Sequence, residues 1–382
     1  MDSPTHVIDP DGEVIIVLQN ANSSFAETTE EDVVANGSPH TVTKYDEETS
    51  SPTEEPVDAQ EDVAADEPDP TEKTSAEEPI EQPDETGPLP KSPDKKCFRI
   101  QVSAKHLTLA SPVFKKLLTS HFKEGITYLQ TGSVEVIAES WDLEALLILL
   151  RAIHGQQYQI PQKLSLDVVA NIALLVDYYE CAEAVYIWTT LWIAALEKEL
   201  SKAYSRDSIS WLFICKVFRL SARFRETTSI VMSCSSSGWI SNFGLPIPDQ
   251  VIAAMNKCRE EAIAKLIDKL HQTLTDLLND SRGCSYECRS IMYGALTKQM
   301  QSNDLLSPRP VTPFPGVSYK QLVQKVSGFR SPQWVVGERS RYYHSCLGSS
   351  FARLFGELSD SIEGLHLENF VPPIPITLSE GK

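Results

Sequence analysis

The sequence predicts an α+β protein in which a small mixed sheet is capped by helices and followed by a mainly helical C-terminal region. Three observations predict this class. β-rich runs come early in the chain, apolar residues at helical spacing dominate its later parts, and an acidic segment separates the first strand from the rest. The 382 residues leave room for two modest domains once that segment is subtracted.

The first predicted strand lies in residues 1–26. Asp11-Gly12 is a strong turn signal, and it stands between two short β-rich runs, Val7-Ile8 and Val14 to Leu18. We therefore expect a buried strand over the second run.

Residues 27–95 form an acidic, proline-rich insertion. They hold 22 Asp and Glu against 4 Lys, a charge of −18 within a total of −19. Ten prolines and few aromatic residues leave too little apolar surface to offset chain entropy, so we expect disorder here. Because the remainder is nearly neutral and shows no basic cluster, nucleic-acid binding is not expected.

The main part of the first domain is predicted in residues 96–200. Cys97 to Val102 and Ser133 to Ile137 alternate as strands do. Ser111 is a good N-cap with Pro112 at the first helical position, so two short helices should meet there. Further helices are expected over Asp142–His154, Leu164–Tyr178 and Ala182–Leu200.

A helical C-terminal domain is predicted in residues 203–370, with a tail at 371–382. Its main element is a long helix from Pro248-Asp249 to about Asn279, which carries apolar residues on one side and Arg259, Glu260, Lys265 and Asp268 on the other. Because no strict heptad is kept, packing within a bundle is favoured over a coiled coil. A Pro-rich connector, Leu305 to Pro315, precedes shorter helices near Tyr319–Val326 and Leu347–Ser359.

Several short motifs of the first domain follow one another in an order and spacing typical of a known family. They are Gly12-Glu-Val-Ile-Ile-Val17, His106 to Leu118, Phe122-Lys-Glu-Gly125, Leu146 to Gly155 and Asn171 to Tyr179. With these motifs the chain resembles the BTB/POZ domain over roughly residues 7–25 and 97–200. The His-Gly pair before a proline and the stretch Val176 to Cys181 resemble the fungal type. The resemblance implies a non-enzymatic scaffold that self-associates, as a homodimer, or recruits protein partners.

The same resemblance implies an alternative role, that of a substrate adaptor. In BTB adaptors of cullin-type ubiquitin ligases, a hydrophobic-x-acidic triplet after the helix pair contacts the cullin. Phe122-Lys-Glu124 falls in the matching place, and an exposed Phe beside a carboxylate is a reasonable partner-binding anchor. The other interpretation is that Phe122 packs into its own domain while Glu124 is solvated.

One group of residues has the donor types of a metal site: Cys284, Cys288, His344 and Cys346. Soft thiolates with an imidazole suit tetrahedral zinc, which would tie a loop after the long helix to the chain near its end. The other interpretation is a set of scattered buried cysteines. With zinc, a further alternative function is a zinc-stabilised regulatory protein in transcription or signalling.

No catalytic residues and no cofactor other than this zinc are expected. The chain contains no Gly-x-Ser-x-Gly elbow, phosphate-binding loop or His-Glu-x-x-His pair. The first residues do not resemble a secretory signal, and the most apolar run, Cys181 to Leu196, is shorter than the roughly 20 residues that span a bilayer. Eight cysteines scattered through apolar segments fit a reducing compartment. We therefore expect an intracellular protein, in cytoplasm or nucleus, that is neither secreted nor in a membrane.

Overall fold

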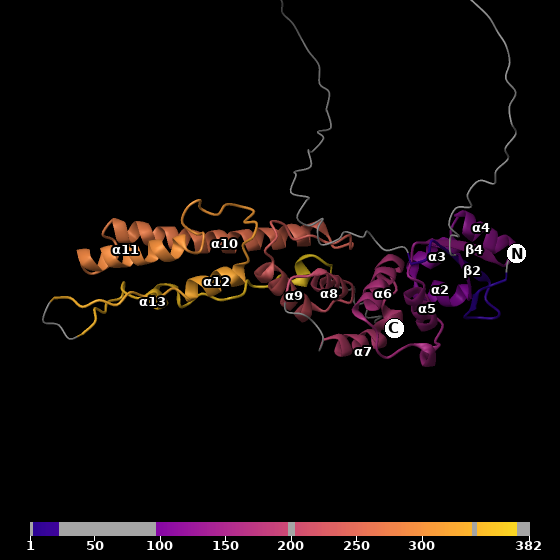
Figure 1. Cartoon of the computed structure of the whole chain (residues 1–382). Coiled ribbons are helices and arrows are strands. Elements are labelled where there is room, and N and C mark those ends of the chain that lie inside the picture. Colours follow the sequence, from indigo (N-terminus) through magenta and orange to yellow (C-terminus); the bar gives the residue numbers. More distant parts are fainter. Residues whose placement is uncertain (1–2, 23–96, 198–202, 338–341, 373–382) are drawn as a thin grey trace, which may run out of the picture. The chain divides into compact units, whose positions relative to one another are not determined.

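The computed structural model describes residues 3–22, 97–197, 203–337 and 342–372 (Figure 1). The acidic insertion, with its expected disorder, lies outside the described residues. So do the last positions of the helix expected to reach Leu200 and most of the C-terminal tail.

A four-stranded mixed sheet joins the segments on either side of the insertion. Its strands are β1 (His6–Val7), β2 (Val14–Gln19), β3 (Phe98–Val102) and β4 (Val134–Glu139), in the order β1-β3-β2-β4. β2 pairs antiparallel with β3, with Leu18 opposite Phe98, and parallel with β4. The predicted strands are confirmed, and the strand before the insertion shares a sheet with the strand after it.

The turn at Asp11-Gly12 does not close a hairpin between neighbouring strands. β1 pairs in parallel with β3, which lies between β1 and β2. The chain must therefore pass close to the end of β3 before it enters β2. A Cβ on Gly12 would lie 2.5 Å from the carbonyl oxygen of Val102, so glycine is required at this approach.

Helices cover the sheet and complete the first domain. They are α2 (Ala104–Ala110), α3 (Pro112–Thr119), α4 (Lys123–Thr131), α5 (Leu143–Ile153), α6 (Leu166–Tyr179) and α7 (Tyr186–Leu196), with short 3-10 turns at η1 (Gln157–Gln159) and η2 (Ala182–Val185). The Oγ of Ser111 accepts a hydrogen bond from the Phe114 N–H at 3.1 Å, which confirms the predicted N-cap. The sequence did not predict α4.

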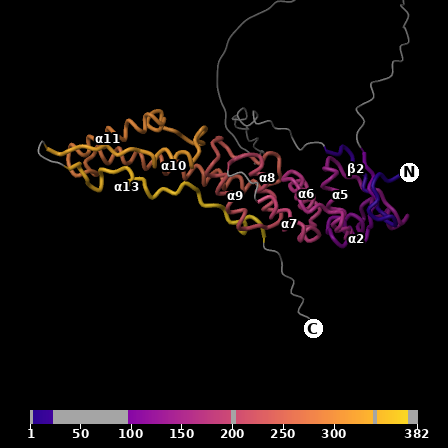
Figure 2. The backbone as a smooth tube through the Cα atoms, turned by 60° about the horizontal axis from the view of Figure 1, so that its bottom comes forward, coloured from indigo at the N-terminus to yellow at the C-terminus, as the bar shows by residue number. Residues whose placement is uncertain are grey.

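The C-terminal half is helical, as predicted. It contains α8 (Arg206–Val217), α9 (Ser221–Cys234), α10 (Asp249–Leu278), α11 (Tyr286–Gln301), α12 (Tyr319–Ser327), α13 (Phe351–Phe355) and the 3-10 turn η3 (Leu367–Asn369). α10 matches the predicted long helix and runs beside α11 (Figures 1 and 2). Among the helices that the structure describes, none combines the length and hydrophobicity needed to cross a bilayer.

Buried hydrophobic residues form two clusters, and α10 contributes to both. We call the first the sheet core: it includes β2, β3 and β4, the helices α2, α3 and α5 to α9, and the start of α10, with Val251 and Met255. The second, the helical core, includes α10 from Ile263 to Leu277 together with α11, α12 and α13.

Arg259 lies on α10 between these two cores, and its predicted place on the polar face is wrong. The side chain is fully buried. Its guanidinium donates hydrogen bonds to the carbonyl oxygens of Ser235 (3.2 Å), Pro313 (3.0 Å), Phe314 (3.1 Å) and Val317 (2.9 Å). Burial lowers the pKa of this group. Arg259 is buried because its fork of N–H donors satisfies carbonyls at the end of α9 and in the connector before α12.

Candidate metal centre

The four predicted ligands, Cys284, Cys288, His344 and Cys346, meet in one place. One ligand atom from each lies within 4.8 Å of all the others. The Cys284 Sγ is 3.3 Å from the His344 Nε2, and the Cys288 Sγ is 3.7 Å from the Cys346 Sγ. A tetrahedral zinc with Zn–S bonds of about 2.3 Å would place two sulfurs about 3.8 Å apart. The group is therefore close enough to hold a metal ion.

The N-terminus of α11 positions the first two ligands. Ser285 is the N-cap, and its Oγ accepts the Cys288 N–H at 3.2 Å, so Cys284 precedes the helix and Cys288 lies in its first turn. Gly283 has φ +98°, and a Cβ there would lie 2.6 Å from the Cγ of Arg289, so glycine allows the chain to enter the site. The positive end of the helix dipole favours thiolates at these positions.

A loop between α12 and α13 supplies the other two ligands. The His344 N–H donates to the Trp334 carbonyl at 2.7 Å, and the two rings stack with centroids 4.6 Å apart. The Cys346 N–H donates to the Ser349 Oγ at 2.9 Å. This turn explains why the helix predicted from Leu347 begins only at Phe351.

Cys346 of the cluster differs from the buried cysteines of the sheet core in the direction of its pKa shift. Burial raises the pKa of Cys181 to about 12 and also raises the pKa of Cys215. In the cluster, burial raises the pKa of Cys288 to about 11. At Cys346 burial also acts to raise the pKa. Hydrogen bonds from His344, the Gly348 backbone, Cys288 and Ser349 outweigh it and lower the pKa to about 6. One thiol of the cluster is thus close to the charged form that binds metals.

The predicted partner-binding residues, Phe122 and Glu124, lie at the start of α4. Phe122 is the N-cap and is 50 % exposed, and Glu124 lies partly exposed in the first turn. Ile126 is 44 % and Leu129 73 % exposed, at positions four and seven after Phe122. We call these three apolar residues the α4 stripe, because such spacing puts them on one helix face. The spacing of Phe122, Ile126 and Leu129 is a sequence signal that could have indicated this helix face.

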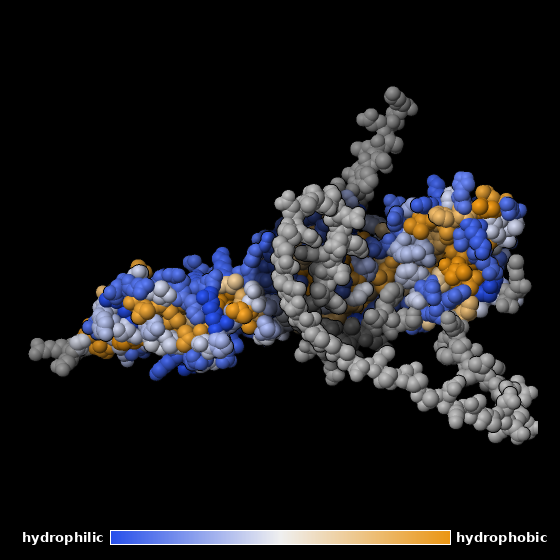
Figure 3. Space-filling view, turned by 90° about the horizontal axis from the view of Figure 1, so that it is seen from above, coloured by the Kyte–Doolittle hydropathy of each residue, from blue (hydrophilic) through white to orange (hydrophobic). Residues whose placement is uncertain are grey.

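Figure 3 views the molecule from the side on which α4 lies in Figure 1. Hydrophobic residues are exposed on that part of the surface, next to polar ones. Within α4 the stripe lies next to exposed polar residues, Lys123 and Gln130.

A scan against models of known protein families finds no match to this chain, and a search of curated proteins finds none either. The resemblance to the BTB/POZ domain therefore depends on the order and spacing of the motifs described above.

Proposed function

We propose that this chain is a non-enzymatic protein-interaction scaffold of the BTB/POZ type, which acts through the sheet and helices of its first domain. The α4 stripe is the observation that carries the proposal. Phe122, Ile126 and Leu129 expose apolar surface on one face of a single helix. Each Å² of such surface gains about 25 cal/mol when it is removed from water, so a protein partner is the natural way to bury it.

A second copy of the chain is the partner that we propose first. Two-fold contacts are self-complementary, so an apolar stripe on one copy would meet the same stripe on the other. Lys123 and Glu124 lie next to Phe122 in the first turn of α4 and carry opposite charges. Across a two-fold axis, Lys123 of one copy would lie opposite Glu124 of the other copy, and the reverse pair would form as well.

Light scattering of the full chain at micromolar concentration tests this dimer. We expect twice the chain mass of 42.5 kDa for the natural sequence and the single mass for Phe122→Ser combined with Leu129→Ser. Leu109→Ser is the matched control, because Leu109 is 88 % exposed on α2 outside the stripe, and it should remain dimeric. A monomeric natural chain, or a stripe variant that remains dimeric, would contradict the proposal.

Adaptor of a cullin-type ubiquitin ligase is the second candidate function. It is supported by the exposure of Phe122 and the partial exposure of Glu124 at the position that the resemblance implies. A cullin that co-purifies with the natural chain should be lost from Phe122→Ala/Glu124→Ala and kept by Leu109→Ala. Retention by the double variant would count against this function.

We further propose that the cluster of Cys284, Cys288, His344 and Cys346 binds a structural zinc ion. Three thiols and one imidazole fill all four positions of a tetrahedral ion, whereas catalytic zinc keeps one position open. This complete donor set supports a role in holding the fold together and agrees with a non-enzymatic protein. Metal analysis of the purified full chain should find one zinc ion per chain.

A further inference from the structure

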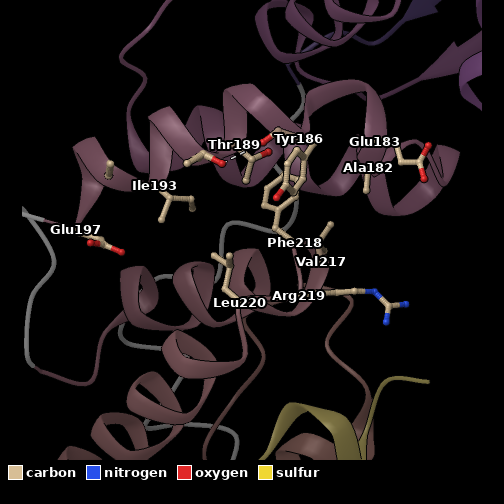
Figure 4. Close-up of a pocket in the computed structure, with 12 residues that line it drawn as sticks. Ala182, Glu183, Tyr186, Thr189, Ile193, Glu197, Val217, Phe218, Arg219 and Leu220 are labelled. Carbon is tan, nitrogen blue, oxygen red and sulfur yellow. Dashed lines mark hydrogen bonds between the residues drawn. The ribbon is translucent and has the colours of Figure 1, made fainter. Parts of the chain in front are cut away.

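An apolar groove lies between α7 and the turn that joins α8 to α9 (Figure 4). Its volume is about 540 Å³. Tyr186 and Ile193 line it from α7, and Phe218 and Leu220 line it from the turn. In Figure 4 Arg219 lies at one end of the groove and Glu197 at the other. A cavity of this size and character is typical of a binding site for apolar groups.

α7 carries more apolar surface than the described fold covers. Its sequence, Tyr-Ile-Trp-Thr-Thr-Leu-Trp-Ile-Ala-Ala-Leu, is hydrophobic on every face, which is typical of a helix buried all round. Yet Tyr186 and Ile187 are each 74 % exposed, and Leu191 is 46 % exposed. Tyr186 lines the groove, so a segment packed there would cover part of this exposed apolar surface.

The C-terminal end of the described chain is held at the rim of this groove. After η3 the ring of Phe370 packs near that of Phe224. Arg219, which lines the groove, donates a hydrogen bond from Nη1 to the Pro372 carbonyl at 2.6 Å. Arg219 itself has φ +55°, a conformation that a non-glycine residue rarely adopts. The residue that fixes the last described position therefore belongs to the wall of the groove.

The residues that follow Pro372 have a composition that suits an apolar groove. They read Pro373-Ile-Pro-Ile-Thr-Leu378. Three branched aliphatic side chains supply apolar surface, and the two prolines have no N–H that would need a partner. Proline-rich chains also lose little conformational entropy on docking, because they are extended beforehand.

The reach of this segment matches the groove. Six residues in the polyproline conformation extend about 19 Å. The eleven residues of α7 span about 16 Å. We propose that residues 373–378 of the same chain occupy this groove along α7, anchored by the hydrogen bond from Arg219 to Pro372. This inference does not depend on the function proposed above.

A peptide competition experiment tests the occupancy. A fluorescent peptide of residues 373–382 is titrated into the full chain and into a chain that ends at Pro372. A tethered segment has an effective concentration near the millimolar range. The full chain should therefore bind the peptide at least tenfold more weakly than the shortened chain. The same peptide with Ile374→Glu and Ile376→Glu should lose binding to both.

Hydrogen exchange provides a second measurement, which uses a chain of full length. In the full chain, Ile374→Glu with Ile376→Glu should raise exchange in Tyr186–Leu196 and in residues 217–220. Circular dichroism checks that the chain ending at Pro372 and the full chain with Ile374→Glu and Ile376→Glu both remain helical. Equal peptide binding by the full and shortened chains would show that the groove serves a separate partner, and would overturn the proposal. No peptide binding to either chain, with unchanged exchange, would also overturn it.

Discussion

The sheet core and the helical core are stabilised in different ways. Among the described residues the sheet core contains 49 buried hydrophobic residues, and the helical core contains 18. Small hydrophobic cores rarely supply enough free energy alone and are commonly reinforced by cross-links or metals. The helical core has Arg259 near one end of its part of α10, and the Cys284 to Cys346 cluster follows the other end. The buried Arg259 and the four candidate metal ligands thus adjoin the core with fewer buried hydrophobic residues.

Loss of a metal ligand should have the largest effect, and it should act on the helical core alone. Zinc binding contributes about 10–16 kcal/mol in zinc-finger peptides, which is comparable with the whole stability of many domains. Cys288→Ser, or a chelator, should therefore remove zinc and raise hydrogen exchange throughout Tyr286–Gln301. Exchange in the strands of the sheet core should stay unchanged.

Cys258→Ser is the matched control for this experiment. Cys258 is partly buried on α10, and it is not among the four clustered ligands. The control should keep one zinc ion per chain. If Cys288→Ser kept its zinc and its protection, or if both cores lost protection together, the contrast between the cores would be wrong.

Removing the buried guanidinium should have the next largest effect. Arg259→Met keeps much of the side-chain volume but removes the Arg259 donors from four carbonyls. The Phe314 carbonyl still accepts the Val317 N–H, and the contacts to Pro313 and Val317 are only partly buried. Since each unsatisfied group costs about 1–3 kcal/mol, we expect a loss of roughly 3 kcal/mol or more in the free energy of unfolding by urea. Lys265→Met on the exposed face of α10 should change it by less than about 0.5 kcal/mol. Equal changes in the free energy of unfolding for Arg259→Met and Lys265→Met would show that the contacts of Arg259 with the carbonyls contribute little to stability.

The smallest expected effect is a pH dependence that belongs to the sheet core. His154 contacts the Leu150 carbonyl through Nδ1 (2.7 Å) and accepts the Ser103 N–H at Nε2 (3.0 Å). Burial lowers the pKa of His154, and the nearby His106 adds to this. The bonds to Leu150 and Ser103 and the charge of Asp9 act in the opposite direction. The pKa of His154 in the folded chain is below its ordinary value in the unfolded chain. At pH values between these two pKa values, the unfolded chain therefore binds more protons than the folded chain.

Stability should therefore fall as the pH decreases below about 7, and the urea midpoint at pH 7.5 should exceed that at pH 5.5. His154→Gln removes the titrating ring and should flatten this dependence. His121→Gln, which changes an exposed histidine, should leave it as it is. An identical pH slope in both variants would exclude His154 as its source.

Local signals predicted much of the fold. Ser111 and Pro112 predicted a helix start because capping depends only on neighbouring residues. Periodicity predicted α10 because eight helical turns repeat the same apolar face. Arg259 was misplaced because its charge predicts exposure, whereas its burial depends on carbonyls contributed by distant segments. The α4 helix was missed because it is short, with nine residues, and because Gly125 in its first turn lowers the helix propensity of the segment.

The candidate metal centre could be predicted from residue type but not from geometry. Cys284 and Cys288 are four residues apart in the sequence, and His344 and Cys346 are two residues apart, so each pair is a local pattern. Their meeting requires α11 and the loop before α13 to pack together, which no local spacing reports. The residues of the α7 groove carry no motif, since the groove forms only when α8 and α9 fold back against that helix.

The antiparallel pairing of β2 with β3 has a consequence for how the chain could be re-engineered. Leu18 and Phe98 lie opposite each other, so the chain leaves β2 and enters β3 at the same end of these two neighbouring strands. The entropy of closing a loop grows only with the logarithm of its length, and doubling that length costs about 0.6 kcal/mol. We therefore expect that a reporter domain or a linker of different length, inserted between β2 and β3, leaves the pairing of Leu18 with Phe98 unchanged.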